Sequence, residues 1–119
     1  MKTFNFESRG VKYRNCYFDV GEYIDGKICL AIYGKVEHDN IVSHISNPTI
    51  DVEEELAENE VVIDNTINTN LISFLLERGI VKRIPKRIIV GSKILPVVEL
   101  NLDVLDEYSF KEEGLRYAS

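Results

Sequence analysis

The densest group of reactive side chains in this 119-residue sequence is the carboxylate run DVEEELAENEVVID, residues 51–64. It contains seven acidic residues and no lysine or arginine. Uncompensated carboxylates attract cations, so they can compete for the lysines and arginines with which another protein holds phosphates. The candidate partner-binding residues are Glu53, Glu54, Glu55, Glu58, Glu60 and Asp64. The alternative is a solvated connection between two strands, in which Glu58 and Glu60 order a turn.

A basic band follows the acidic run. The sequence has no lysine or arginine between Val36 and Glu77, and cations cluster directly afterwards at Arg78, Lys82, Arg83, Lys86, Arg87 and Lys93. A cationic patch of this kind can bind nucleic-acid phosphates. The candidate residues for that contact are Lys82, Arg83, Lys86, Arg87 and Lys93. Two alternatives stay open: lysines that protect a solvated edge strand from pairing, or a band that neutralises the acidic run internally.

Tyrosines form a third group, in the two long strands expected near the N-terminus. They are Tyr13, Tyr17, Tyr23 and Tyr33, with Lys12 and Arg14 interleaved. Aromatic faces beside cations can bind single-stranded nucleic acid by stacking and phosphate contact. Tyrosine is also favoured in sheets for its packing alone, so both interpretations stay open.

No catalytic or metal-binding pattern accompanies these groups. The sequence lacks a glycine-rich phosphate loop and a nucleophile elbow, and His38 and His44 have no cysteine pair beside them. Glu54 and Glu58 in a solvated loop could not have the divergent pKa values that acid–base catalysis needs, because burial is what separates such values. We therefore expect no enzymatic activity, no cofactor and no metal.

The first half of the chain is expected to form antiparallel strands over residues 4–8, 11–20, 27–36 and 41–46. Arg9-Gly10 and Asp25-Gly26 supply turns, and Asn47-Pro48 ends the last strand. Strict alternation in the second strand places Cys16, Phe18 and Val20 on one face and Tyr13, Tyr17 and Asp19 on the other. Cys16 and Cys29 are interpreted as small buried thiols, with a disulfide left open.

The second half combines strands with one helix. Residues 61–63 read as a short buried strand, and NTNLISFLLERGI, residues 68–80, carries an apolar stripe at helical spacing. Asn68 or Thr69 is expected as its N-cap, and Gly79 suits its C-terminal left-handed position. RIIVGSKILPVVELNLDVL reads as two further strands joined near Gly91-Ser92. The expected fold is α+β, an antiparallel sheet of about six or seven strands covered by one main helix.

Composition limits the class of protein. A chain of 119 residues with 45% hydrophobic residues and net charge −6 predicts a single globular domain over residues 1–119. No apolar run approaches the ~20 residues that a membrane span needs. The segment MKTFNFESRG lacks the apolar stretch of a signal peptide, so a cytoplasmic location is expected.

Three segments carry a resemblance to a known family: DGKICLAIYG, LAENEVVIDNTINTNLISFLLERGI and PVVELNLDVL, in that order. They resemble an uncharacterised family, a domain of unknown function, of small proteins found on bacterial phages, plasmids and conjugative elements. The resemblance covers roughly residues 10–105. Its core pattern is L-x-E-N-E-x-x-I-D, here Leu56, Glu58, Asn59, Glu60, Ile63 and Asp64.

This resemblance implies a setting in the bacterial host cell and no reaction. Small acidic proteins of mobile elements often protect those elements from host defences, and some are anti-CRISPR inhibitors. The hypothesis is an inhibitor that binds a type II RNA-guided nuclease, or its guide complex, through the acidic surface and blocks nucleic-acid loading or binding. The alternatives are a nucleic-acid-binding accessory protein that uses the basic band, and a small structural or interaction module.

Overall fold

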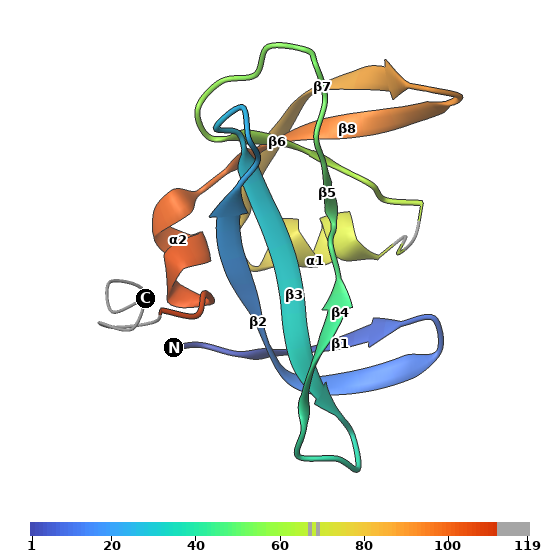
Figure 1. Cartoon of the computed structure of the whole chain (residues 1–119), viewed down its shortest axis with the longest axis vertical. Coiled ribbons are helices and arrows are strands. Elements are labelled where there is room, and N and C mark those ends of the chain that lie inside the picture. The colour runs from blue at the N-terminus through green and yellow to red at the C-terminus, as the bar shows by residue number, and fades with distance from the viewer. Residues whose placement is uncertain (67, 69, 112–119) are drawn as a thin grey trace.

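A computed structural model describes residues 1–66, 68 and 70–111 of the chain. These residues contain eight strands and two short helices, arranged as two four-stranded antiparallel sheets (Figure 1). The α+β class is therefore confirmed. A single sheet of six or seven strands under one main helix is wrong, because the strands divide between two sheets and a second helix is present.

The first sheet is the expected meander. Its strands pair in the order β1-β2-β3-β4, and their bounds are β1 Phe4–Ser8, β2 Val11–Glu22, β3 Ile28–Val36 and β4 Val42–Ser46. Arg9 and Gly10 both have positive φ, 52° and 79°, which is the geometry of a tight two-residue hairpin turn. The turn signals in the sequence thus predicted this half of the fold correctly.

The second sheet has the order β5-β6-β8-β7. The bounds are β5 Thr49–Ile50, β6 Glu60–Ile63, β7 Val81–Val90 and β8 Lys93–Leu100. The chain crosses from one sheet to the other at Asn47-Pro48, between β4 and β5. Because proline has no amide hydrogen to continue the ladder with β3, the chain is free to pair with β6 instead. This break explains why one continuous sheet does not form.

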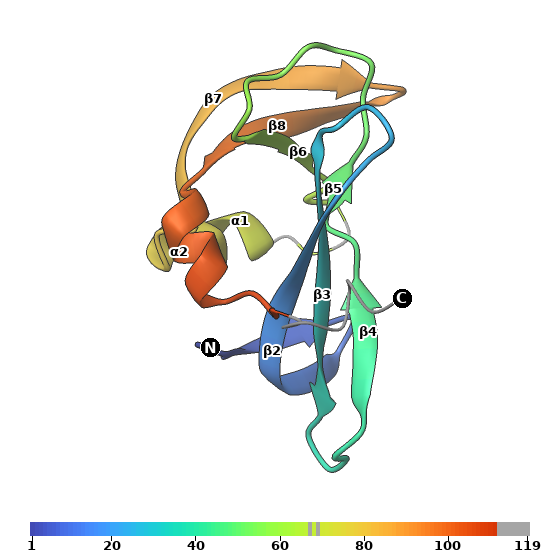
Figure 2. The same cartoon turned by 60° about the vertical axis from the view of Figure 1, so that its left-hand side comes forward.

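The main core lies between the two sheets and the helices α1 Leu71–Glu77 and α2 Leu102–Glu107, which lie on the same side of the first sheet (Figure 2). Its fully buried members include Phe18 and Ile32 from the first sheet, Leu100 from the second, and Leu75 from α1. Burying a side chain of this size contributes about 1.5–3 kcal/mol. The core therefore holds both sheets in one unit.

The helix boundaries differ from the sequence prediction. The N-cap of α1 is Asn70, without a side-chain cap bond, whereas Asn68 turns the chain two residues earlier by accepting a hydrogen bond from the Asn70 amide at 3.1 Å. Asn68 as N-cap is thus wrong, and Thr69 lies outside the described residues. Gly79 has the expected positive φ of 73°. Helix α2, capped by Asn101, replaces the end of a predicted strand.

Because β2 contains a β-bulge, the side-chain faces predicted for this strand are wrong. The register shifts between Arg14 and Tyr17, and Asn15 has φ 54°. An inserted residue reverses the alternation on one side of the bulge. Tyr13 consequently packs against the same core as Cys16, rather than lying on the opposite face with Tyr17.

Candidate functional site

Four of the six candidate acids lie on one ordered connection, residues 51–59, between β5 and β6. We call this connection the acid loop; it arches over the second sheet (Figure 2). Val52 and Leu56 of the loop pack against a small second core formed by Val62, Leu95 and Val97, on the face of the sheet that points away from the main core. The loop is therefore a cover of that face as well as a carrier of charge.

Hydrogen bonds hold the acid loop in place. The Lys27 ammonium donates to the Val52 carbonyl, and the amide of Leu100 donates to the Asn59 carbonyl at 2.8 Å. Near its end the Ala57 amide donates to Oε1 of Glu60 at 2.9 Å, while the Glu60 amide donates to the Ala57 carbonyl at 3.0 Å. Glu60 thus orders a turn, as the alternative interpretation of this segment expected.

Two of the six candidate acids contact the basic band. Lys86 Nζ lies 3.5 Å from Glu54 Oε2, and Lys93 Nζ lies 3.6 Å from Asp64 Oδ2. Asp64 is only 9% exposed, and its carboxylate also accepts hydrogen bonds from the amide and the hydroxyl of Thr66. The Thr66 hydroxyl bond, with the Thr66 amide and Lys93, holds the pKa of Asp64 below its usual value. These two acids are partly neutralised within the chain.

Glu60 is half-buried in its turn, and the remaining three candidate acids are exposed. Within the part of the chain that the structure describes, Glu53, Glu55 and Glu58 form no ion pair. They border a surface hollow of about 560 Å³ between the acid loop and the β2–β3 turn, where Asp25 also lies. The uncompensated part of the predicted site is therefore smaller than the sequence indicated, and it is centred on these three carboxylates.

Asp25 was expected only as a turn residue, and the fold brings it to the acid loop. Hydrogen bonds from the Lys27 amide and ammonium lower the pKa of Asp25. Loss of hydration and a hydrogen bond with the Asp25 carboxyl raise the pKa of the neighbouring Asp51. In the sequence, Asp25 is marked only as a turn residue beside Gly26. A turn signal carries no information about contacts with residues far along the chain, so the place of Asp25 beside the acid loop could not be predicted.

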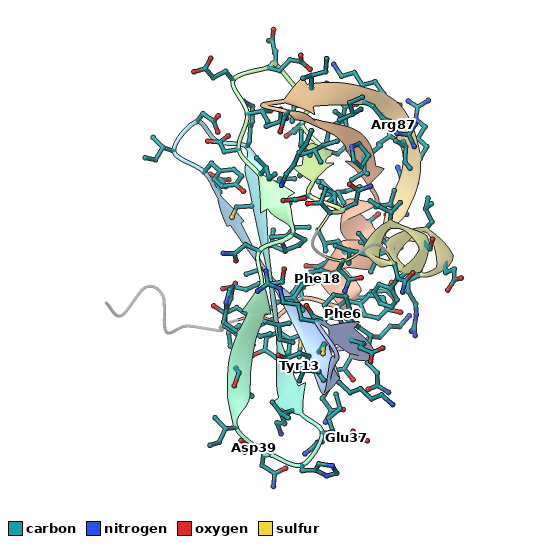
Figure 3. The ribbon with its side chains drawn as sticks, turned by 90° about the vertical axis from the view of Figure 1, so that its right-hand side faces the viewer. Phe6, Tyr13, Phe18, Glu37, Asp39 and Arg87 are labelled. Atoms are coloured by element: carbon teal, nitrogen blue, oxygen red, sulfur yellow. The ribbon has the colours of Figure 1, made fainter. Side chains whose placement is uncertain are left out.

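The basic band lies on and beside β7, an edge strand of the second sheet. Arg83 pairs with Glu99 at 3.2 Å, so together with Lys86 and Lys93 three of its five candidate residues contact carboxylates. Lys82 and Arg87 are exposed and form no ion pair among the described residues; Figure 3 shows Arg87 on the outside of β7. The band is therefore broken by the chain's own acids.

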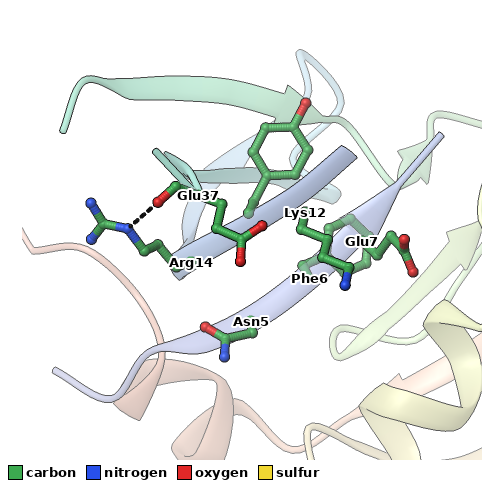
Figure 4. A pocket seen from close by; sticks show the side chains of 7 residues that line it. Asn5, Phe6, Glu7, Lys12, Arg14 and Glu37 are labelled. Carbon is green, nitrogen blue, oxygen red and sulfur yellow. Dashed lines mark hydrogen bonds between the residues drawn. The ribbon is translucent and has the colours of Figure 1, made fainter. Parts of the chain in front are cut away.

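A further hollow of about 410 Å³ lies beside β1 and β2, lined in part by Phe6, Lys12 and Tyr13 (Figure 4). The Arg14 guanidinium at its rim donates to the Glu37 carbonyl at 3.4 Å. Among the described residues, no group of histidine, cysteine, aspartate and glutamate side chains is arranged to hold a metal ion. His44 Nε2 forms a hydrogen bond with the Asn47 side-chain oxygen at 2.8 Å.

Comparison with family models, curated proteins and solved structures finds no match to this chain. The resemblance to a mobile-element family accordingly stays a prediction. Neither helix in the described residues is long and apolar enough to cross a membrane.

Proposed function

We propose that this protein binds a basic, phosphate-holding surface of another protein through Glu53, Glu55 and Glu58 of the acid loop. The observation that carries the proposal is that these three carboxylates are exposed and lack ion pairs in the described structure, on a loop fixed by apolar and backbone contacts. The other three candidate acids, Glu54, Glu60 and Asp64, each already have a partner within the chain.

A fixed loop favours this use of charge. Ordering a flexible segment on binding costs free energy, and Val52 and Leu56 have already ordered the acid loop before any partner arrives. Carboxylates held toward solvent also steer a cationic partner and speed its association. The loop is thus suited to binding a protein surface rich in lysine and arginine.

The amount of charge limits what the loop can block. Duplex DNA carries one charge per ~1.7 Å of axis, so three carboxylates replace only about 5 Å of duplex. Mimicry of a whole duplex is therefore beyond this surface. Occupation of one local guide-binding or target-binding patch is within its reach.

The resemblance suggests the partner. We propose that the protein is encoded by a mobile element, acts in the bacterial cytoplasm, and inhibits a type II RNA-guided nuclease by occupying such a patch. In that class of nuclease, the guide and target are held in positively charged channels. The proposed role is binding, without catalysis or a cofactor.

The test is a binding titration with a purified type II effector, with and without its guide RNA. We expect binding that weakens as salt rises, because exposed charges are screened. If the loop competes for the guide channel, the guide-loaded effector should bind more weakly than the guide-free one. Absence of binding to both forms at low salt would refute the partner assignment.

A second candidate function rests on Lys82 and Arg87, the two exposed cations of β7 that lack a carboxylate partner in the described residues. They could contact a phosphate backbone, as could Arg83, Lys86 and Lys93 if their ion pairs open. Such binding predicts an affinity for duplex DNA or RNA that falls linearly with salt on logarithmic axes. A gel shift at low salt that compares the unmodified protein with K82Q/R87Q tests this function. Weaker binding by the variant would support it, and no shift by the unmodified protein would refute it.

A further inference from the structure

A row of aromatic side chains crosses the first sheet on its outer face. The Tyr17 and Tyr33 rings are nearly parallel, 13° apart, with centroids at 6.0 Å. The row continues to His44, whose ring lies 5.3 Å from Tyr33, and to Phe110, whose ring lies 5.9 Å from Tyr17. These residues come from four neighbouring segments: residues 108–110, β2, β3 and β4.

The sheet register explains the row. Tyr17 lies directly opposite Tyr33, and Tyr33 directly opposite His44, so their side chains share a face. Phe18 and Ile32, their neighbours along the strands, are fully buried and point to the core. The β2 bulge is what separates Tyr17 from Tyr13 and gives them opposite environments.

Packing alone does not account for this row. Cross-strand aromatic pairs do stabilise sheets, and Tyr17 and Tyr33 gain from that contact. Phe110, however, is 45% exposed, and His44 is exposed as well. Both helices lie on the other side of the sheet (Figure 2), so no described helix covers the row.

Two cations lie next to the row. Arg14 and Lys35 lie directly opposite each other on β2 and β3. They are the next cross-strand pair after Tyr17 and Tyr33. Like charges in this position destabilise a sheet. Among the described residues neither forms an ion pair with a carboxylate: Arg14 donates to the Asp39 carbonyl at 3.0 Å and to the amide oxygen of Asn40 at 2.7 Å. One acid, Asp19, lies near Tyr17.

The acid loop is far enough along the molecule to leave this region accessible to an anion. It contacts the β2–β3 turn through Lys27 and Val52, at the end of the strands away from β4 (Figure 1). Exposed charges farther apart than a Debye length, about 8–10 Å, are largely screened at physiological salt. The net charge of −6 therefore does not exclude an anionic ligand on the aromatic row.

We propose that the outer face of β2, β3 and β4 binds single-stranded nucleic acid, with bases stacked on the aromatic row and phosphates contacted by Arg14 and Lys35. The half-buried Tyr17 and Tyr33 rings and the exposed Phe110 and His44 rings can accept any base, because every base has a π face, and adjacent cations hold the backbone. A duplex is a poorer ligand, since its bases are already stacked on one another. This site is separate from both the acid loop and the basic band.

The direct test uses fluorescein-labelled oligo-dT and oligo-U of fifteen nucleotides and a matched DNA duplex, in fluorescence anisotropy at low salt. We expect both single strands to bind more tightly than the duplex; the preference between dT and U identifies DNA or RNA as the ligand. The chain has no tryptophan and six tyrosines, so the part of the tyrosine quenching that is lost in Y17L/Y33L reports stacking on the aromatic row.

Double variants of the row and of the adjacent cations test whether these residues form the binding site. Y17L/Y33L keeps an apolar cross-strand pair and should weaken binding at least about fivefold, the lower end of what loss of a stacked base costs. R14Q/K35Q should weaken binding and flatten its salt dependence. The matched control K2Q/R78Q removes the same charge beside helices α2 and α1 and should bind like the unmodified protein, whereas K82Q/R87Q tests the basic band.

Amide chemical-shift changes in the unmodified protein provide a readout that does not depend on variant stability. They should fall on β2, β3 and β4 when oligo-dT or oligo-U is added. The proposal is overturned by three results: no binding of either single strand at low salt, equal binding of Y17L/Y33L and the unmodified protein, or loss of binding only in K82Q/R87Q.

Discussion

The ammonium nitrogen of Lys86 lies 3.5 Å from a carboxylate oxygen of Glu54, which connects strand β7 to the acid loop. Both side chains are about half exposed, at 47% and 51%. An ion pair this exposed contributes little to folding. It does, however, neutralise one carboxylate of the acid loop, which lies between Glu53 and Glu55 in the sequence.

Replacing Lys86 with glutamine should release Glu54 for a partner. We expect the free energy of unfolding to change by less than ~0.5 kcal/mol, because exposed pairs contribute so little. Affinity for a basic partner surface should rise by a few-fold. R87Q is the matched control, since it removes the same charge from β7 without releasing a carboxylate. Equal gains in the two variants would show that net charge alone sets the affinity.

Asp64 is the acid of this set with a structural role. Replacing it with asparagine should lower the free energy of unfolding by about 1–2 kcal/mol at pH 7, because hydrogen bonds to a charged group are lost. The control is E53Q, which removes an exposed carboxylate and should leave stability unchanged. Urea unfolding measures both effects.

The effect of D64N should also depend on pH. The folded protein holds the pKa of Asp64 below its ordinary value of 3.8, so the contribution of this carboxylate is complete above 3.8 and disappears as pH falls through the folded pKa. The difference between D64N and the unmodified protein should therefore be constant from pH 5 to 8 and shrink below about pH 4. A difference that persisted at the lowest pH would contradict the assigned cause.

Gly34 leaves room for the bulge in β2. A Cβ atom at this position would lie 2.5 Å from Sγ of Cys16 and 3.0 Å from Cδ1 of Ile45. We expect G34A to destabilise the protein by about 1–3 kcal/mol, the usual cost of overpacking a core. The double variant C16A/G34A should recover part of that loss, and thermal unfolding of the four proteins tests the coupling. Strict additivity would mean that Cys16 is not the side chain in conflict.

Cys16 should be chemically inert while the protein is folded. Burial raises the pKa of its thiol to about 11, so almost no reactive thiolate exists at pH 8. Cys29 is only half-buried and serves as the internal comparison. Mass spectrometry after iodoacetamide treatment should find Cys29 modified first and Cys16 modified only after unfolding. Rapid labelling of Cys16 in the folded protein would contradict its buried position.

The sequence predicted local structure better than pairing. Turn residues such as Arg9-Gly10 and the apolar stripe from Leu71 to Leu75 act over a few positions, so the meander and helix α1 were found. The division into two sheets depends on which strand pairs with Thr49–Ile50. That partner is β6, which begins ten residues further along the chain. Helix α2 was missed because Leu102 and Val104 also fit strand alternation.

The same limit applies to the candidate site, where residue types could be predicted and contacts between distant segments could not. The acidic run was visible in the sequence, whereas the identity of its uncompensated members was not. Glu54 and Asp64 contact lysines of the basic band because β7 and β8 lie beside the acid loop and the end of β6. Glu53, Glu55 and Glu58 differ from them only in what the fold places nearby, and residue type carries no information about that.

The most direct measurement is the dissociation constant of E53Q/E55Q/E58Q for a guide-free type II effector, compared with that of the unmodified protein. The matched control E7Q/E77Q/D103N removes three exposed carboxylates elsewhere. We expect the acid-loop variant to remain folded and to bind at least about tenfold more weakly, because charges at an interface affect both the association rate and the affinity. The control should stay within about twofold of the unmodified protein. Equal affinity of the acid-loop variant and the unmodified protein would contradict the proposed function.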